Sequence, residues 1–171
     1  MQKFGRTAVL GAVAAVAVFG VTACGGDSSA APAAPNRECT ADDIKTTGSF
    51  GQVPTITIPD GCAPPKKLLT KDLSAGTGKA AAAGSKLSMN YLVVTWSDKK
   101  KLDSSFDRGE PFGLDLGAGQ VIEGWDQGLV GVKQGGRRLM IIPPALAYKD
   151  GGRGIAPNET LVFVTDALSV S

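Results

Sequence analysis

Histidine is absent from the sequence of 171 residues, and cysteine is scarce. Without histidine the chain has no Ser-His-Asp or Cys-His catalytic centre and no zinc site with imidazole ligands. The three cysteines, Cys24, Cys39 and Cys62, are too few for a structural zinc site made of thiolates alone. We therefore expect neither a bound metal nor a cofactor.

The chain also lacks an excess of charge. Lys3 and Arg6 are the only charged side chains among the first 23 residues, so the rest of the chain carries 16 basic and 16 acidic residues. Proteins that bind nucleic acid or anionic lipid by charge present a basic surface. The equal numbers of basic and acidic residues argue against charge-driven binding of nucleic acid or of anionic lipid. With 43% hydrophobic and 20% charged residues, the composition fits one globular domain with extensions.

The N-terminus is typical of an exported lipoprotein. After Lys3 and Arg6, an apolar run covers residues 7–21. Its length of about 15 residues is typical of the apolar region of a signal peptide and is shorter than the ~20 residues that a membrane-spanning helix needs. A membrane anchor or a buried helix is the alternative. The run ends in Val21-Thr22-Ala23-Cys24, which resembles the bacterial lipobox.

This motif implies that residues 1–23 are removed and that Cys24 carries a diacylglyceryl group. Each buried CH₂ contributes ~0.8 kcal/mol, so two acyl chains hold a protein stably on a membrane. We therefore expect an exported protein, lipid-anchored at the extracytoplasmic face of the cell membrane. Residues 24–36 are small, polar and proline-rich, which predicts a flexible linker.

Residues 37–65 contain the other two cysteines. In an exported protein, Cys39 and Cys62 are most simply a disulfide, with two free thiols as the alternative. Between them, residues 55–58 alternate at period two and predict a strand, which Pro54 and Pro59 would keep at a sheet edge. The sequence assigns no function to this segment, and we treat it as a structural prefix to the main domain.

The main domain covers residues 66–171. Strands are predicted at residues 68–73, 86–96, 112–116, 137–142 and 160–170, and one helix with an apolar face at 120–130. The clearest strand places Leu87, Met89, Tyr91 and Val93 on one face. Residues 99–101 predict a solvated turn and residues 145–159 a long loop. Because helices do not alternate with strands, the pattern predicts an α+β fold: an antiparallel sheet packed on one short helix.

Four blocks carry a resemblance to a known family. They are Leu102-Asp103-Ser104-Ser105, residues 119–125 (GQVIEGW), residues 142–148 (IPPALAY) and Thr160-Leu161-Val162-Phe163. In this order they resemble the FKBP-type peptidyl-prolyl cis-trans isomerases over about residues 67–171. The resemblance implies a twisted antiparallel sheet half-wrapped around one short helix. It also implies isomerisation of X-Pro bonds, here in exported proteins.

The resemblance further implies an aromatic pocket for the prolyl ring. Trp125 would form its floor, and its walls would be Tyr91, Leu102, Phe112, Val121, Ile122, Ile155 and Phe163. Asp103 would lie at its edge, and the Tyr148 hydroxyl and the N–H of Ile122 would donate to ligand carbonyls. We assign catalysis to Asp103, Phe112, Trp125 and Tyr148 and substrate binding to the others. The alternative interpretation makes the aromatic residues plain core and Asp103 a turn cap.

Three positions depart from the family's usual pattern. Leu102 and Leu146 stand where aromatic residues are usual, and Lys149-Asp150 follows Tyr148 where a glycine is usual, in a loop shortened by about two residues. The expected partners are proline-containing polypeptides, macrolides such as tacrolimus or rapamycin, and the membrane, with a monomeric chain. A catalytically weak peptide-binding or chaperone module and a structural envelope spacer are the rival functions.

Overall fold

The computed structural model describes residues 37–152 and 154–171. The predicted signal peptide, the lipidation site at Cys24 and the linker therefore lie outside the described residues. Within the described ranges, no helix combines the length and apolar character needed to cross a membrane.

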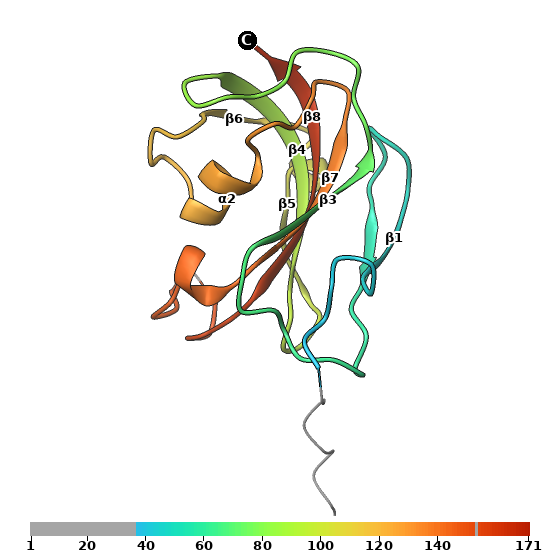
Figure 1. Ribbon diagram of the computed structural model, residues 1–171, viewed down its shortest axis with the longest axis vertical. Coiled ribbons are helices and arrows are strands. Elements are labelled where there is room, and N and C mark those ends of the chain that lie inside the picture. The colour runs from blue at the N-terminus through green and yellow to red at the C-terminus, as the bar shows by residue number, and fades with distance from the viewer. Residues whose placement is uncertain (1–36, 153) are drawn as a thin grey trace, which may run out of the picture. The chain divides into compact units, whose positions relative to one another are not determined.

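A twisted antiparallel sheet of six strands forms the centre of the described chain (Figure 1). The strand order is β3-β7-β8-β4-β5, and β6 pairs with the other end of β4. Strands β4 and β8 form the longest ladder, from Leu87 opposite Val170 to Thr95 opposite Leu161. The bounds are β3 Leu69–Ser74, β4 Lys86–Thr95, β5 Lys101–Ser104, β6 Phe112–Asp115, β7 Arg137–Ile142 and β8 Leu161–Val170.

The helices are short: α1 covers Ser105–Arg108, α2 covers Glu123–Gly128, and a 3₁₀ turn covers Pro144–Leu146. The sheet with α2 on one face confirms the predicted α+β class (Figure 1). The bounds of the predicted helix were too wide, because Ile122 has an extended backbone and caps α2 rather than joining it. The solvated turn predicted at residues 99–101 ends one residue too late: Lys99 and Lys100 are exposed in the connection between β4 and β5, but Lys101 begins β5.

The sheet buries apolar side chains on both faces. On the α2 face, Met89, Met140 and Leu129 are inaccessible to solvent and belong to one large cluster. Side chains of β4, β7 and β8 alternate between faces, so their neighbours form a second cluster on the other side. Its members are Ile44, Ile58, Leu92, Val94, Leu139, Ile141, Val162 and Val164.

Residues 37–65 cover this second face. They form an antiparallel hairpin of β1 Lys45–Thr47 and β2 Thr55–Thr57, which lies across the sheet from α2 (Figure 1). Ile44 and Ile58 beside the two strands are 5% and 4% exposed and pack onto the sheet. Cys39 and Cys62 form a disulfide with a Cα–Cα distance of 5.1 Å. The predicted prefix is therefore packed as part of the fold.

A buried ion pair fastens the hairpin to the sheet. Arg137 of β7 and Asp166 of β8 are 2% and 0% exposed and pair at 2.6 Å. Arg137 also donates to the carbonyl oxygens of Gly48 and Gln52, each at 2.6 Å, and the N–H of Gly51 donates to Asp166 at 2.7 Å. The hairpin thus supplies the hydrogen bonds that a buried ion pair needs to offset its desolvation.

Candidate active site

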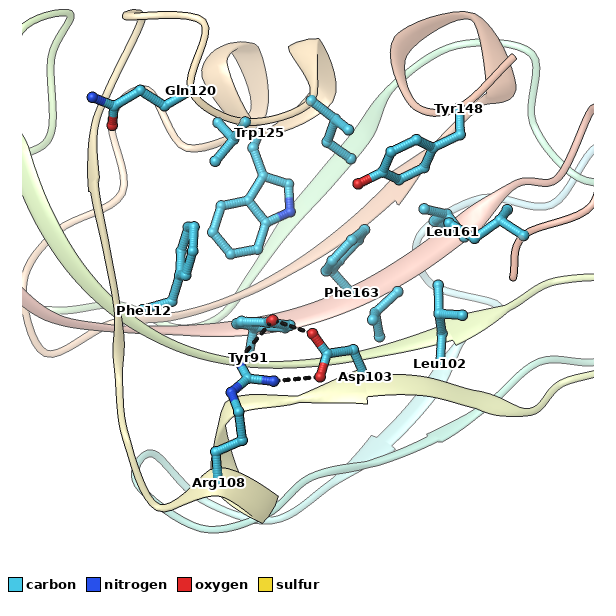
Figure 2. A pocket seen from close by; sticks show the side chains of 14 residues that line it. Tyr91, Leu102, Asp103, Arg108, Phe112, Gln120, Trp125, Tyr148, Leu161 and Phe163 are labelled. Carbon is cyan, nitrogen blue, oxygen red and sulfur yellow. Dashed lines mark hydrogen bonds and ion pairs between the residues drawn. The ribbon is translucent and has the colours of Figure 1, made fainter. Parts of the chain in front are cut away.

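A cavity of about 620 Å³ opens on the α2 face of the sheet (Figure 2). Every residue that the sequence analysis assigned to the proline pocket lines it, together with Val93, Arg108, Gln120 and Leu161. The complete lining is Tyr91, Val93, Leu102, Asp103, Arg108, Phe112, Gln120, Val121, Ile122, Trp125, Tyr148, Ile155, Leu161 and Phe163.

Four aromatic side chains form one end of the cavity (Figure 2). Trp125 lies at their centre, with ring centroids 5.4 Å from Tyr91, 5.9 Å from Phe112 and 5.5 Å from Phe163. All three pairs meet edge to face, the arrangement that aromatic rings prefer. The rings come from β4, β6, β8 and α2, so the complete sheet-and-helix fold is required to assemble them. Trp125 is 4% exposed, whereas Phe112 at the mouth is 37% exposed.

A hydrogen-bonded group of three side chains forms the polar edge of the cavity. The hydroxyl of Tyr91 and the guanidinium of Arg108 both donate to the carboxylate of Asp103. Arg108 also donates to the Tyr91 hydroxyl oxygen at 2.9 Å, and its guanidinium carbon lies 5.5 Å from the Tyr91 ring centroid. The N–H of Ser104 donates to Asp103 at 2.7 Å, and Asp103 lies in strand β5 rather than in a turn. Asp103 therefore serves both local structure and the cavity edge.

These contacts fix the charge states at the edge. Burial raises the pKa of Asp103, but hydrogen bonds from Tyr91, Ser104 and Arg108 outweigh it, and the net pKa lies below the usual range. Burial, then the bond to Asp103, raises the pKa of the Tyr91 hydroxyl. At neutral pH the edge therefore holds a carboxylate and a neutral phenol.

The loop between β7 and β8 closes the opposite side. Figure 2 shows the Tyr148 hydroxyl directed into the cavity, and Ile155, 7% exposed, belongs to the main core. The N–H of Asn158 donates to the carbonyl oxygen of Lys149 at 3.0 Å, which links two positions within the loop. The buried carboxylate of Glu159 accepts the N–H groups of Trp96 and Ser97, each at 3.0 Å. The loop is thus attached to the turn after β4.

Four lining residues, Val93, Arg108, Gln120 and Leu161, were not predicted from the sequence. Val93 and Leu161 share a sheet face with Tyr91 and Phe163, so strand alternation carried the signal that was needed. Arg108 reaches the cavity only because α1 folds back toward β4, which no local pattern indicates. The side-chain oxygen of Gln120 accepts the N–H of Asp115 at 3.0 Å and closes the rim between β6 and α2.

The cavity offers little for covalent or metal chemistry. The ionisable residues that line it are Asp103, Arg108 and two tyrosines. Asp103 already forms an ion pair with Arg108. Elsewhere in the described ranges, one cluster with metal-ligand spacing includes Cys39 and Cys62, whose sulfur atoms are bonded to each other. The geometry suits noncovalent binding of a compact apolar group against Trp125.

Comparison with known proteins decides the family. The sequence model of the FKBP-type peptidyl-prolyl cis-trans isomerases matches residues 77–167, more than half of the chain. The chain belongs to this family. Members of the FKBP family are peptidyl-prolyl cis-trans isomerases, which confirms the enzyme class predicted from the sequence blocks.

Three similar proteins support this assignment. An FK506-binding protein of Streptomyces anulatus is 49% identical over 120 residues, which are 68% of this chain and 96% of that protein. The crystal structure of AtFKBP13 is 33% identical with a TM-score of 0.57, covering 63% of this chain and 96% of that one. FkpA from Escherichia coli is 41% identical with a TM-score of 0.56, covering 61% of this chain and 48% of that one. The matches share the FKBP fold of sheet and short helix.

Proposed function

We propose that this FKBP-type protein isomerises X-Pro bonds of exported polypeptides while anchored by lipid at the outer face of a bacterial membrane. The observation that carries the catalytic part is the aromatic end of the cavity. The prolyl ring would lie on Trp125, between Tyr91, Phe112 and Phe163, whose rings are already packed in that arrangement.

The cavity lowers the barrier without covalent chemistry. Rotation about an X-Pro bond is slow because it breaks amide resonance, at a cost of ~20 kcal/mol. The twisted amide is less polar than the planar one, since charge returns from oxygen to nitrogen. A largely apolar cavity therefore disfavours the planar amide more than the twisted one, and a site that binds the twisted form best accelerates the reaction.

The polar groups around the cavity would orient the substrate. The Tyr148 hydroxyl and the N–H of Ile122 would donate to substrate carbonyl oxygens. Asp103, held by Tyr91 and Arg108, would lie beside the carbonyl that precedes the proline. None of these roles requires a proton transfer.

Export and anchoring are supported by two features of the chain. The apolar run of residues 7–21 ends at the lipobox-like Val21-Thr22-Ala23-Cys24. The Cys39–Cys62 disulfide fits an oxidising compartment outside the cytoplasm.

Mass spectrometry of the membrane fraction tests the proposed lipid anchoring. The mature chain should begin at a lipidated Cys24, and Cys24→Ala should leave a soluble or uncleaved form. An unmodified Cys24 in the mature protein would refute the anchoring.

Catalysis on protein substrates has its own test. The slow phase of refolding of an exported protein that is limited by prolyl isomerisation should accelerate with added residues 25–171. A slow phase that stays unchanged while the added protein is folded would refute the foldase role.

A catalytically weak peptide-binding module is the second candidate. Leu102 favours it, because an aliphatic side chain lines the cavity where the family usually has an aromatic one. In such a module, carrying Trp96→Phe, a proline peptide would quench or shift the fluorescence of Trp125 without any acceleration of isomerisation.

FK506 is a second probe of the cavity, since relatives are named FK506-binding proteins. We propose that it occupies the same cavity.

A further inference from the structure

Helix α2 approaches strand β7 unusually closely, because two glycines face the strand. A Cβ added to Gly124 would overlap the side chain of Ile142, and one added to Gly128 would lie 2.7 Å from the sulfur of Met140. Both strand residues are fully buried. Gly124 and Gly128 are one turn apart, and Ile142 and Met140 point to the same sheet face. The two elements therefore touch at two points along their length.

The next residue on that strand face is Arg138, which reaches the C-terminal end of α2. Its Nη1 donates to the carbonyl oxygens of Gly128 and Val130, each at 2.9 Å. Its Nε donates to Asp72 of β3 at 2.6 Å, and the residue as a whole is 8% exposed. The last carbonyl groups of a helix have no partner within the helix. Arg138 supplies that partner, and Asp72 orients the guanidinium.

We propose that Arg138 is a positioning residue for the isomerase site. Together with Met140 and Ile142 it fixes the height and axial position of α2 above the sheet. That helix begins after Ile122 and carries Trp125, so its position sets the depth of the aromatic cavity. The inference rests on the proposed isomerase function, but it concerns residues outside the cavity lining.

The neighbouring Arg137 provides a matched control. It lies on the same strand and is 2% exposed in its side chain, but it points to the opposite sheet face. There it binds Asp166, Gly48 and Gln52, far from α2. Arg→Lys at either position keeps the charge and loses the planar fork that donates several hydrogen bonds at once. A purely structural role predicts the same behaviour for both substitutions.

The experiment compares Arg138→Lys, Arg138→Met and Arg137→Lys, in chains whose Trp96 is replaced by Phe. For each, kcat/KM on a proline-containing tetrapeptide and the emission of Trp125 are measured well below the unfolding midpoint. Because small misplacements of binding groups reduce rates strongly, we expect about a tenfold loss of kcat/KM in Arg138→Met and a smaller loss in Arg138→Lys. Trp125 emission should shift in both, whereas Arg137→Lys should change neither quantity.

A second pair of variants covers the case in which Arg138→Met does not fold. Gly124→Ala should raise α2 from the sheet and lower kcat/KM, and Gly124→Ala with Ile142→Ala should restore most of the loss. Equal kcat/KM and equal Trp125 emission in the two Arg→Lys variants, or no rescue by Ile142→Ala, would overturn the proposal. A different result would count against the isomerase function and not against the role of Arg138: the parent chain shows no isomerase activity, but Trp125 emission still shifts in the two Arg138 variants and stays unchanged in Arg137→Lys.

Discussion

The phenolic hydroxyl of Tyr91 donates a hydrogen bond to the carboxylate of Asp103, and both groups also contact Arg108. Tyr91 thereby links the two parts of the cavity, since its ring packs against Trp125 and its hydroxyl belongs to the polar edge.

Tyr91→Phe keeps the ring and removes the donor to Asp103. Without that donor the Asp103 carboxylate is held less firmly at the cavity edge, and because misplaced binding groups slow catalysis, we expect kcat/KM to fall by roughly 2- to 10-fold. Peptide isomerisation measures this, with near-ultraviolet circular dichroism as the control for an intact aromatic cluster. Full activity in a natively folded Tyr91→Phe protein would show that the hydrogen bond from Tyr91 to Asp103 does not contribute to orienting the substrate.

The pH dependence follows from the depressed pKa of Asp103. A carboxyl group whose pKa is lower in the folded state contributes stability above its unfolded pKa of about 3.9, and this contribution is lost as the pH falls through the folded value. Because the pKa of Asp103 lies below its usual range and that of Tyr91 above it, neither group should titrate between about pH 6 and pH 8, so kcat/KM should be flat. The solvent deuterium isotope effect should be close to one. A bell-shaped profile near neutrality would indicate proton transfer instead.

The disulfide should affect stability and leave catalysis unchanged. Cys39 and Cys62 lie 23 residues apart in the chain, and a loop of that size restrains the unfolded state by about 3 kcal/mol. Cys39→Ser with Cys62→Ser should therefore lower the urea unfolding midpoint. Because the hairpin packs on the sheet face opposite the cavity, kcat/KM should stay the same. A parallel loss of activity in the folded protein would contradict this separation.

Removing residues 37–65 should be more damaging. A chain of residues 66–171 would expose the sheet face formed by Leu92, Val94, Leu139, Ile141, Val162 and Val164. It would also strip the backbone partners from Arg137 and Asp166. We expect aggregation or binding of a hydrophobic dye, compared with residues 37–171 as the control. A shortened chain that is monomeric and equally stable would show that the hairpin is dispensable.

The sequence predicted the parts of the fold that depend on local patterns. Leu87, Met89, Tyr91 and Val93 alternate along the strand, and the structure buries all four beside α2. Strand β5 was missed because Lys99-Lys100-Lys101 has the polarity of a turn. Its strand conformation comes from pairing with β4, where Val93 lies opposite Asp103.

The role of residues 37–65 was less accessible from the sequence. Residues 139–142 and 161–164 are apolar at every position, which is typical of strands covered on both faces. That pattern implies a second layer, but it does not say which segment supplies it. The contacts of Arg137 with Gly48 and Gln52 span more than 80 residues, and no local signal predicts them.

The most direct test of the account is kcat/KM for isomerisation of a proline-containing tetrapeptide by residues 25–171. The comparison is with Asp103→Val and Phe112→Ala, which alter the polar edge and the aromatic mouth separately. We predict clear catalysis by the parent chain and a loss of about tenfold or more in each variant, with native circular dichroism. Catalysis by both variants at the parent rate would contradict the assignment of this cavity as the isomerase site.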